Sequence, residues 1–279
     1  YTLTAYDQSS SCVTTGSPVE VAPLQIANST NTLTSCNPVQ SQAAVTVTGG
    51  ATTTNATVTQ QAAQAAVVGA AAPGNIGQIG VANGQVLVND LNAASLTAAG
   101  TISSVTLTNY GATSAIDSSA LTSVTLGGTG GTLSIGRGNL TAAPTASTLA
   151  LNLSSLTGTN AISDGEAAAD FGFTTINLAN SGTTVLANLT AVDLTTLNIS
   201  GSGSLTLTAN TLGGATTTTI TNTSTGAVTL GGALDNATLY TGSAGNDTIT
   251  LGATTRAINV GNGSNTVTLS TGTTALGVG

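Results

Sequence analysis

Few side chains in this sequence can carry out chemistry, and those that can are nearly all acidic. The 279 residues contain ten Asp and Glu, two Arg and no His or Lys, for a formal net charge of −8. Without His or Lys, the chain lacks the groups that most often exchange protons or activate a nucleophile near neutral pH. Carboxylate and amide oxygens are instead suited to a hard cation such as Ca²⁺. We therefore predict that the protein is not an enzyme and expect Ca²⁺ as its cofactor.

The densest acidic group is formed by Asp164, Glu166 and Asp170, in a stretch rich in Gly and Ala. Three carboxylates this close in sequence are one candidate calcium site. The alternative is a loop whose charge only keeps the surface soluble. Two carboxylates would also suffice for a glycosidase, but Phe171 and Phe173 are the only nearby aromatic residues that could hold a sugar, which disfavours that activity.

The charge balance also limits the partners. Arg137 and Arg256 are the only basic residues, too few to neutralise a row of phosphates or an anionic lipid surface, so we expect no nucleic-acid partner. The longest run of small apolar residues, 62–72, is mostly Ala and is shorter than the roughly 20 residues that a spanning helix needs. We therefore expect no membrane insertion.

The two cysteines, Cys12 and Cys36, lie in an irregular N-terminal segment, residues 1–45, that also contains three of the five prolines. The two cysteines do not form a CxxC motif and the chain has no His, so nothing indicates a metal or redox site. We therefore predict a disulfide between Cys12 and Cys36. Such a bond would imply an oxidising, extracellular compartment. Two unpaired thiols are the alternative.

The rest of the chain is punctuated by short strand-like runs. Residues 46–100 are predicted as a β-rich connecting region, with one short helix over residues 60–72. From residue 100 a block of an apolar residue, two hydroxyl residues, and then apolar, variable and apolar residues recurs. Its copies are ISSVTL at 102–107, LTSVTL at 121–126, ASTLAL at 146–151, FTTINL at 173–178 and LTTLNI at 194–199.

These copies start 19, 25, 27 and 21 residues apart and are separated by Gly-rich turns. Their alternation of apolar and polar residues is typical of β-strands, and each copy is too small to bury its own apolar face. We therefore predict an all-β protein in which residues 101–235 form an irregular β-solenoid of stacked coils. A β-sandwich of many short strands is the alternative, for the whole fold or for the N-terminal region.

Residues 236–279 follow a stricter, nine-residue period. Apolar residues occupy two columns of this period, Tyr240, Ile249, Ile258, Val267 and Leu276 in the first, and Leu251, Val260, Leu269 and Val278 in the second. Only Gly242, at the head of the second column, interrupts the pattern. The period predicts a β-roll in which each nonad supplies one turn and one short strand.

Two of these nonads resemble the RTX repeat GGxGxDxUx: residues 242–250 read GSAGNDTIT, and residues 260–268 read VGNGSNTVT. In the β-roll that the resemblance implies, two nonads complete a coil, so Asp247 and Asn265 lie on neighbouring turns along one edge. The resemblance also implies calcium at this edge. Its ligands would come from the turns around Gly245 and Gly263 and from the side chains of Asp247 and Asn265.

The wider chain, with its hydroxyl-rich blocks and little charge, looks like the surface-layer and adhesin-type proteins of bacteria that carry degenerate RTX repeats. The resemblance implies a secreted protein whose copies assemble, with calcium, into a surface-layer lattice or a surface filament. Its main partners would be copies of itself, with cell-surface polysaccharide as a second expected partner. An RTX-type adhesin or glycan-binding module of the cell surface is the alternative function.

Overall fold

The structure is a computed structural model and describes residues 39–63, 80–138, 147–164, 171–213, 218–234, 237–252, 254, 256 and 258–270. Every regular element in these ranges is a β-strand, and the all-β prediction is confirmed. Residues 60–63, which open the predicted helix, are not helical, and its remainder, residues 64–72, lies outside the described ranges. No helix able to cross a membrane occurs in the part of the chain that the structure describes.

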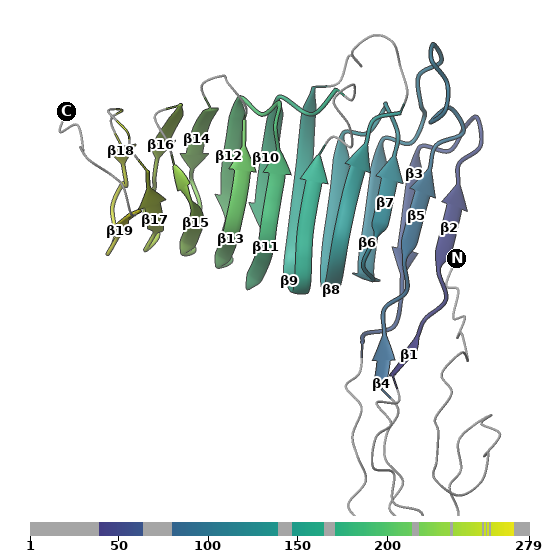
Figure 1. The fold of residues 1–279 in the computed structure, drawn as a ribbon, viewed down its shortest axis with the longest axis horizontal. Coiled ribbons are helices and arrows are strands. Elements are labelled where there is room, and N and C mark those ends of the chain that lie inside the picture. The colour runs from purple at the N-terminus through teal and green to yellow at the C-terminus, as the bar shows by residue number, and fades with distance from the viewer. Residues whose placement is uncertain are drawn as a thin grey trace, which may run out of the picture.

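The strand pairings form two parallel sheets that run along the length of the molecule and are joined by the turns of the coil (Figure 1). The first sheet contains β3 (Asn55–Thr59), β6 (Ser104–Tyr110), the start of β8 (Ser123–Gly136), the start of β9 (Thr148–Asp164), β10 (Thr175–Asn180), β12 (Thr196–Gly201), β14 (Thr218–Asn222), β16 (Thr238–Thr241) and β18 (Ile258–Asn259). The second sheet contains β2 (Val45–Thr48), β5 (Val86–Asn89), β7 (Ser114–Asp117), the ends of β8 and β9, β11 (Thr184–Ala191), β13 (Leu205–Leu212), β15 (Val228–Leu234), β17 (Thr248–Leu251) and β19 (Thr266–Leu269).

Each inner strand of the stack pairs in parallel with its counterpart one coil earlier and one coil later, as a β-solenoid requires. The alternative prediction of a β-sandwich is excluded for these residues, because sandwiches are built from antiparallel sheets. Both sheets continue across residues 100 and 235, where the sequence predicts a change in the type of repeat. A separate short pair, β1 (Val39–Ser41) with β4 (Gly80–Ala82), is also parallel.

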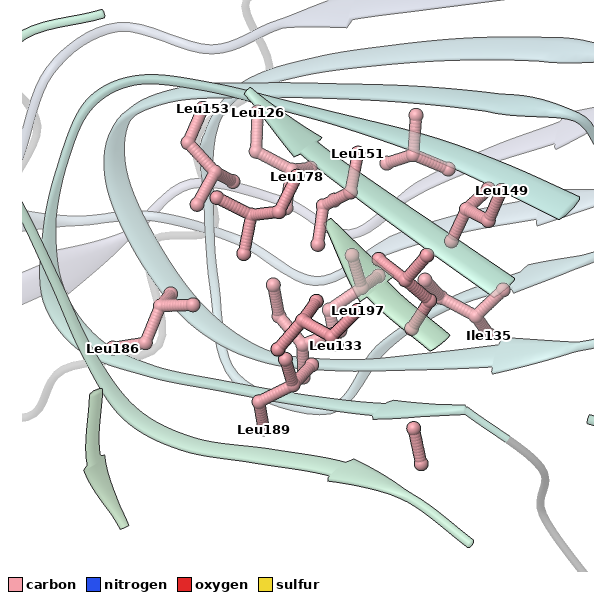
Figure 2. Packing of buried hydrophobic residues seen from close by; sticks show 14 of the residues in the cluster. Leu126, Leu133, Ile135, Leu149, Leu151, Leu153, Leu178, Leu186, Leu189 and Leu197 are labelled. Atoms are coloured by element: carbon pink, nitrogen blue, oxygen red, sulfur yellow. The ribbon is translucent and has the colours of Figure 1, made fainter. Parts of the chain in front are cut away.

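Strict alternation along the strands creates the core. In β6, Val105 and Leu107 are fully buried, whereas Thr106 between them faces outward. Burying a Leu or Val side chain fully is worth about 1.5–3 kcal/mol, so the stacked apolar columns are the main source of stability. Figure 2 shows side chains of both sheets packed together in one core. Those from the first sheet include Leu126, Leu151, Leu153 and Leu178, and those from the second include Leu133, Ile135, Leu186 and Leu189.

The repeated blocks stack as coils, but with one change of register. Val105 pairs with Val124, and Ile176 pairs with Leu197, as the alignment of the blocks predicts. Between β8 and β9, however, Val124 pairs with Leu151. The block alignment places Val124 opposite Leu149, two residues earlier. A shift of two residues keeps every inward side chain inward, so the core pattern survives it.

Candidate cation site at the nonapeptide turns

The structure brings together the two nonapeptide turns that carry Asp247 and Asn265. Strands β17 and β19 pair in parallel with Thr248 opposite Thr266, so the preceding residues of the two turns stack directly. The Asn265 Oδ1 accepts a hydrogen bond of 2.8 Å from the Asp247 backbone N–H. The expectation that two nonads complete one coil therefore holds for these strands, and the two predicted ligands are neighbours.

Gly245 and Gly263 allow these turns to stack closely. A Cβ on Gly263 would lie 2.4 Å from the Gly245 carbonyl oxygen, and the Gly263 φ of +94° is in the region that favours glycine. A Cβ on Gly245 would lie 2.4 Å from the carbonyl oxygen of Gly226, one coil earlier. The glycines of the motif are thus explained by the close approach of successive turns, whether or not a cation is bound.

The carboxylate of Asp247 is turned into the core and is 1% exposed. Its Oδ1 accepts a hydrogen bond of 3.1 Å from the Val228 backbone N–H. Its Oδ2 accepts hydrogen bonds from the Asn222 Nδ2 at 2.8 Å and the Tyr240 hydroxyl at 3.2 Å. Both oxygens are therefore occupied by donors of the protein, which satisfies a charge that would otherwise be costly to bury.

Tyr240 is a suitable donor for this buried carboxylate. Burial raises the pKa of Tyr240 to about 12, and the adjacent Asp247 carboxylate adds to this increase against the lowering effect of the Asn222 hydrogen bond. The phenol consequently keeps its proton throughout the neutral range. Asn222, Tyr240 and Asp247 form a closed polar network inside an otherwise apolar core.

The amide of Asn265 occupies the position at which a cation would meet the carbonyl groups of the turn. Its Nδ2 donates to the carbonyl oxygens of Val260 at 3.1 Å, Gly261 at 3.4 Å and Asn262 at 3.0 Å. Calcium requires six to eight oxygen ligands, including carboxylates. In this arrangement the N–H groups of Asn265 satisfy the carbonyls, and the Asp247 carboxylate faces the other way. In the described geometry, the turn carbonyls and the Asp247 carboxylate are therefore engaged by donors of the protein itself.

The second acidic group is described only through Asp164, because Glu166 and Asp170 lie outside the described residues. Asp164 is the last residue of β9 and occupies a core column, next to Ile135 of β8 and Ala191 of β11. It is 1% exposed, and its Oδ2 accepts a hydrogen bond of 2.7 Å from the Phe173 N–H. Asp164 is therefore a buried capping residue in the described structure.

Arg137 is buried beside Asp164. Its guanidinium lies 4.3 Å from the centroid of the Phe173 ring, and its Nη1 donates to the carbonyl oxygens of Phe171 and Gly172, each at 3.3 Å. Burial lowers the pKa of Arg137, and attraction to the Asp164 carboxylate opposes that shift. An arginine remains charged under these conditions, so it supplies a positive charge inside this corner of the solenoid.

Sequence reasoning missed Asp90, which caps another coil in the same way as Asp164. Its carboxylate accepts hydrogen bonds from the backbone N–H groups of Asn92, Thr101 and Ile102 at 2.6–3.0 Å, and from the Ser118 hydroxyl at 3.0 Å. Desolvation raises the pKa of Asp90, but these hydrogen bonds together outweigh it and hold the pKa below its ordinary value. The available signal was an acid at the end of an alternating strand, followed after a loop by the apolar residue that opens a block: Ile102 for Asp90 and Phe173 for Asp164.

Two further points concern the predicted disulfide and the predicted metal sites. Cys12 and Cys36 lie outside the described residues. Among the residues that are described, no three side chains of Asp, Glu, Cys or His come together as a metal site.

No family model matches the chain, and a search of curated proteins finds no match. The fold and the contacts described above are therefore the observations from which function is argued.

Proposed function

We propose that this protein is an extracellular structural protein whose copies assemble into a surface array, either a lattice or a filament, rather than an enzyme. The observation that carries the proposal is the exposed apolar column on β19, the last strand that the structure describes. Val267 and Leu269 continue the apolar columns of Ile249 and Leu251 on β17, yet they are 44% and 50% exposed. An apolar column that faces solvent favours the addition of another coil.

The backbone of this coil also favours addition. Among the described strands, β19 pairs only with β17, and β18 pairs only with β16. At the opposite end of the described solenoid (Figure 1), β5 is the only described partner of β2, and β6 is the only described partner of β3. An open parallel edge can accept a strand of a second copy, because its N–H and C=O groups then find partners.

The faces of the sheets support a structural role as well. On the first sheet, Asn177 and Asn198 stack, and the Asn198 Nδ2 donates to the Asn177 Oδ1 at 2.8 Å. On the second sheet, Thr206, Thr229, Thr248 and Thr266 form one continuous outward column. Such surfaces carry almost no charge, so neighbouring subunits can approach through hydroxyl and amide groups without strong repulsion.

The assembly test compares two charge-matched variants on one strand. Val267→Asp places a carboxylate in the open core column, whereas Thr268→Asp places the same charge at the adjacent outward position of β19. We expect the purified protein to form ordered sheets or fibres by negative-stain microscopy, Val267→Asp to prevent them, and Thr268→Asp to retain them. A wild-type chain that stays monodisperse at high concentration in millimolar Ca²⁺ would overturn the proposal.

Calcium assistance is a separate part of the proposal. Supporting it, the turn carbonyls of residues 260–262 converge on one point, and the Asp247 carboxylate lies one coil away. Binding there would require the Asn265 amide to rotate away and Asp247 to leave its core partners. We expect added Ca²⁺ to raise the melting temperature of the wild type and EGTA to reverse the change. An equal response in Asp247→Asn would exclude this turn as the calcium site.

A further inference from the structure

A hollow of about 420 Å³ lies on the outer face of the second sheet, over β7, β8, β9 and β11. Its lining consists mainly of outward side chains from the middle coils, among them Thr132, Ser134, Ala161, Ser163, Asn188 and Thr190. Pockets that hold small ligands usually measure about 300–1,000 Å³, so the hollow is large enough for one or two sugar rings.

The hollow exists because small side chains occupy the outward positions of neighbouring strands. Ser134 pairs with Ser163, which pairs with Thr190, and Thr132 pairs with Ala161, which pairs with Asn188. Two parallel columns therefore cross the strands, with about 4.8 Å between successive residues. The Ala and Ser side chains form the floor, and Thr and Asn form the rims.

The side chains of Thr132, Asn188 and Thr190 at the hollow make hydrogen bonds within the protein but keep further donors. The Asn188 Nδ2 donates to the Thr190 Oγ1 at 3.0 Å, and the Thr132 Oγ1 accepts a hydrogen bond of 2.7 Å from the Thr113 N–H. The hydroxyl protons of Thr132 and Thr190 and the second N–H of Asn188 remain available for a ligand. Thr113, at the rim, has a φ of +60°, which is strained for a β-branched residue and is a feature often found at functional sites.

The chemistry of the lining selects the class of ligand. No lining residue is ionisable or aromatic, which disfavours charged molecules and flat apolar ones. The strands below are paired on both sides, so a peptide cannot add to the sheet here by strand addition. A second protein would need apolar or aromatic anchors at the centre of the contact, and the floor offers only Ala and Ser.

We propose that this hollow binds a neutral oligosaccharide, whose hydroxyl groups exchange hydrogen bonds with Thr132, Ser163, Asn188 and Thr190. Each water-exposed hydrogen bond contributes little net free energy, and no aromatic ring stacks on the sugar, so a single site binds weakly, with a Kd of about 1 mM. This inference is independent of the surface array, because the binding is a property of one chain.

The test uses the whole chain at concentrations at which it is monomeric. Saturation-transfer difference NMR and calorimetry would measure binding of three neutral probes, maltohexaose, mannohexaose and laminarihexaose, with oligogalacturonate as a charged comparison. Ser163→Val fills the floor while keeping a side chain suited to a strand. Thr229→Val, at an outward position of β15 beyond the hollow, is the matched control.

We expect at least one neutral probe to bind the wild type, Ser163→Val to weaken that binding by at least tenfold, and Thr229→Val to leave it unchanged. Circular dichroism would verify that both variants are folded. The proposal is overturned if none of the neutral probes binds, if oligogalacturonate alone binds, or if folded Ser163→Val binds as the wild type does. It is also overturned if Ser163→Val changes the oligomeric state without changing sugar binding, because the hollow is then a protein contact.

Discussion

The central coils, β8 to β12, and the nonapeptide coils, β16 to β19, share one plan but differ in how completely they are covered. In the central coils, Leu151 and Leu178 are fully buried, and Asp164 caps the chain where the next coil begins. In the last coil, Val267 and Leu269 hold equivalent inward positions but are 44% and 50% exposed. The regularity of a repeat therefore does not by itself bury its residues, since each coil depends on its neighbours for a core.

Truncating a leucine to alanine should change the free energy of unfolding very differently in the central coils and in the last described coil. Leu151→Ala leaves a cavity in the fully packed core and should lower the free energy of unfolding by about 2–5 kcal/mol. Leu269→Ala, at a position that is half exposed, should cost less than about 1 kcal/mol in the monomer. Chemical denaturation followed by circular dichroism measures both. Equal losses would show that the last coil is as well covered as the central ones.

The buried acid Asp90, which follows β5, should make stability depend on pH. The folded pKa of Asp90 lies below its ordinary value, so its stabilisation is present above about pH 4 and is lost as the pH falls through the folded pKa. Asp90→Ala leaves the N–H groups of Thr101 and Ile102 without this acceptor and should cost about 2–3 kcal/mol at pH 7. The difference from wild type should shrink on acidification. A difference that is the same at pH 3 and pH 7 would contradict the role of its carboxylate.

The turns of the nonapeptide coils should be sensitive to an added methyl group. Gly263→Ala combines a positive φ with a Cβ 2.4 Å from the Gly245 carbonyl oxygen, and should destabilise the last coil by about 1–3 kcal/mol. Gly50→Ala is the control, since its Cβ would have the Thr53 hydroxyl at 3.7 Å as its nearest contact. Hydrogen exchange resolved along the chain would locate the effect. Loss of protection throughout the central coils would show that the terminal coil is not an independent unit.

The smallest effect is expected from the polar network inside the nonapeptide coils. Tyr240→Phe removes one hydrogen bond from Asp247 but leaves those from Asn222 and Val228, so it should cost about 0.5–1.5 kcal/mol. Thermal unfolding at neutral pH measures this loss. A much larger loss would show that the hydroxyl group of Tyr240 supports the whole network.

The strand register was predictable from the sequence in the nonapeptide coils but only in part in the central coils. The nonapeptide period correctly paired Tyr240 with Ile258 and Ile249 with Val267, because successive nonads are nearly identical in length. In the central region the blocks identified the buried residues, but between β8 and β9 the alignment is displaced by two positions. Loops of unequal length separate those blocks, and the pairing then depends on how the turns pack.

The candidate site was predictable in position but not in orientation. Stacking of Asp247 on Asn265 follows from a spacing of 18 residues. The inward rotation of the Asp247 carboxylate depends on Asn222 and Tyr240, which the motif does not include. The role of Asp90 was not predictable from the sequence, because its partners, the N–H groups of Thr101 and Ile102, lie beyond a ten-residue loop. The fold alone brings them next to the Asp90 carboxylate.

The alternation of apolar and hydroxyl residues, the glycine turns and the scarcity of charge can all be read from the amino-acid sequence. These are local properties, and a strand period of two preserves them even when the register shifts by two residues. Only the folded chain establishes which way the side chains of Asp164 and Asp247 point, which of the described coils has an exposed apolar column, and where small side chains meet to form a hollow. Each of these depends on residues from separate coils being placed side by side, and local periodicity does not specify that placement.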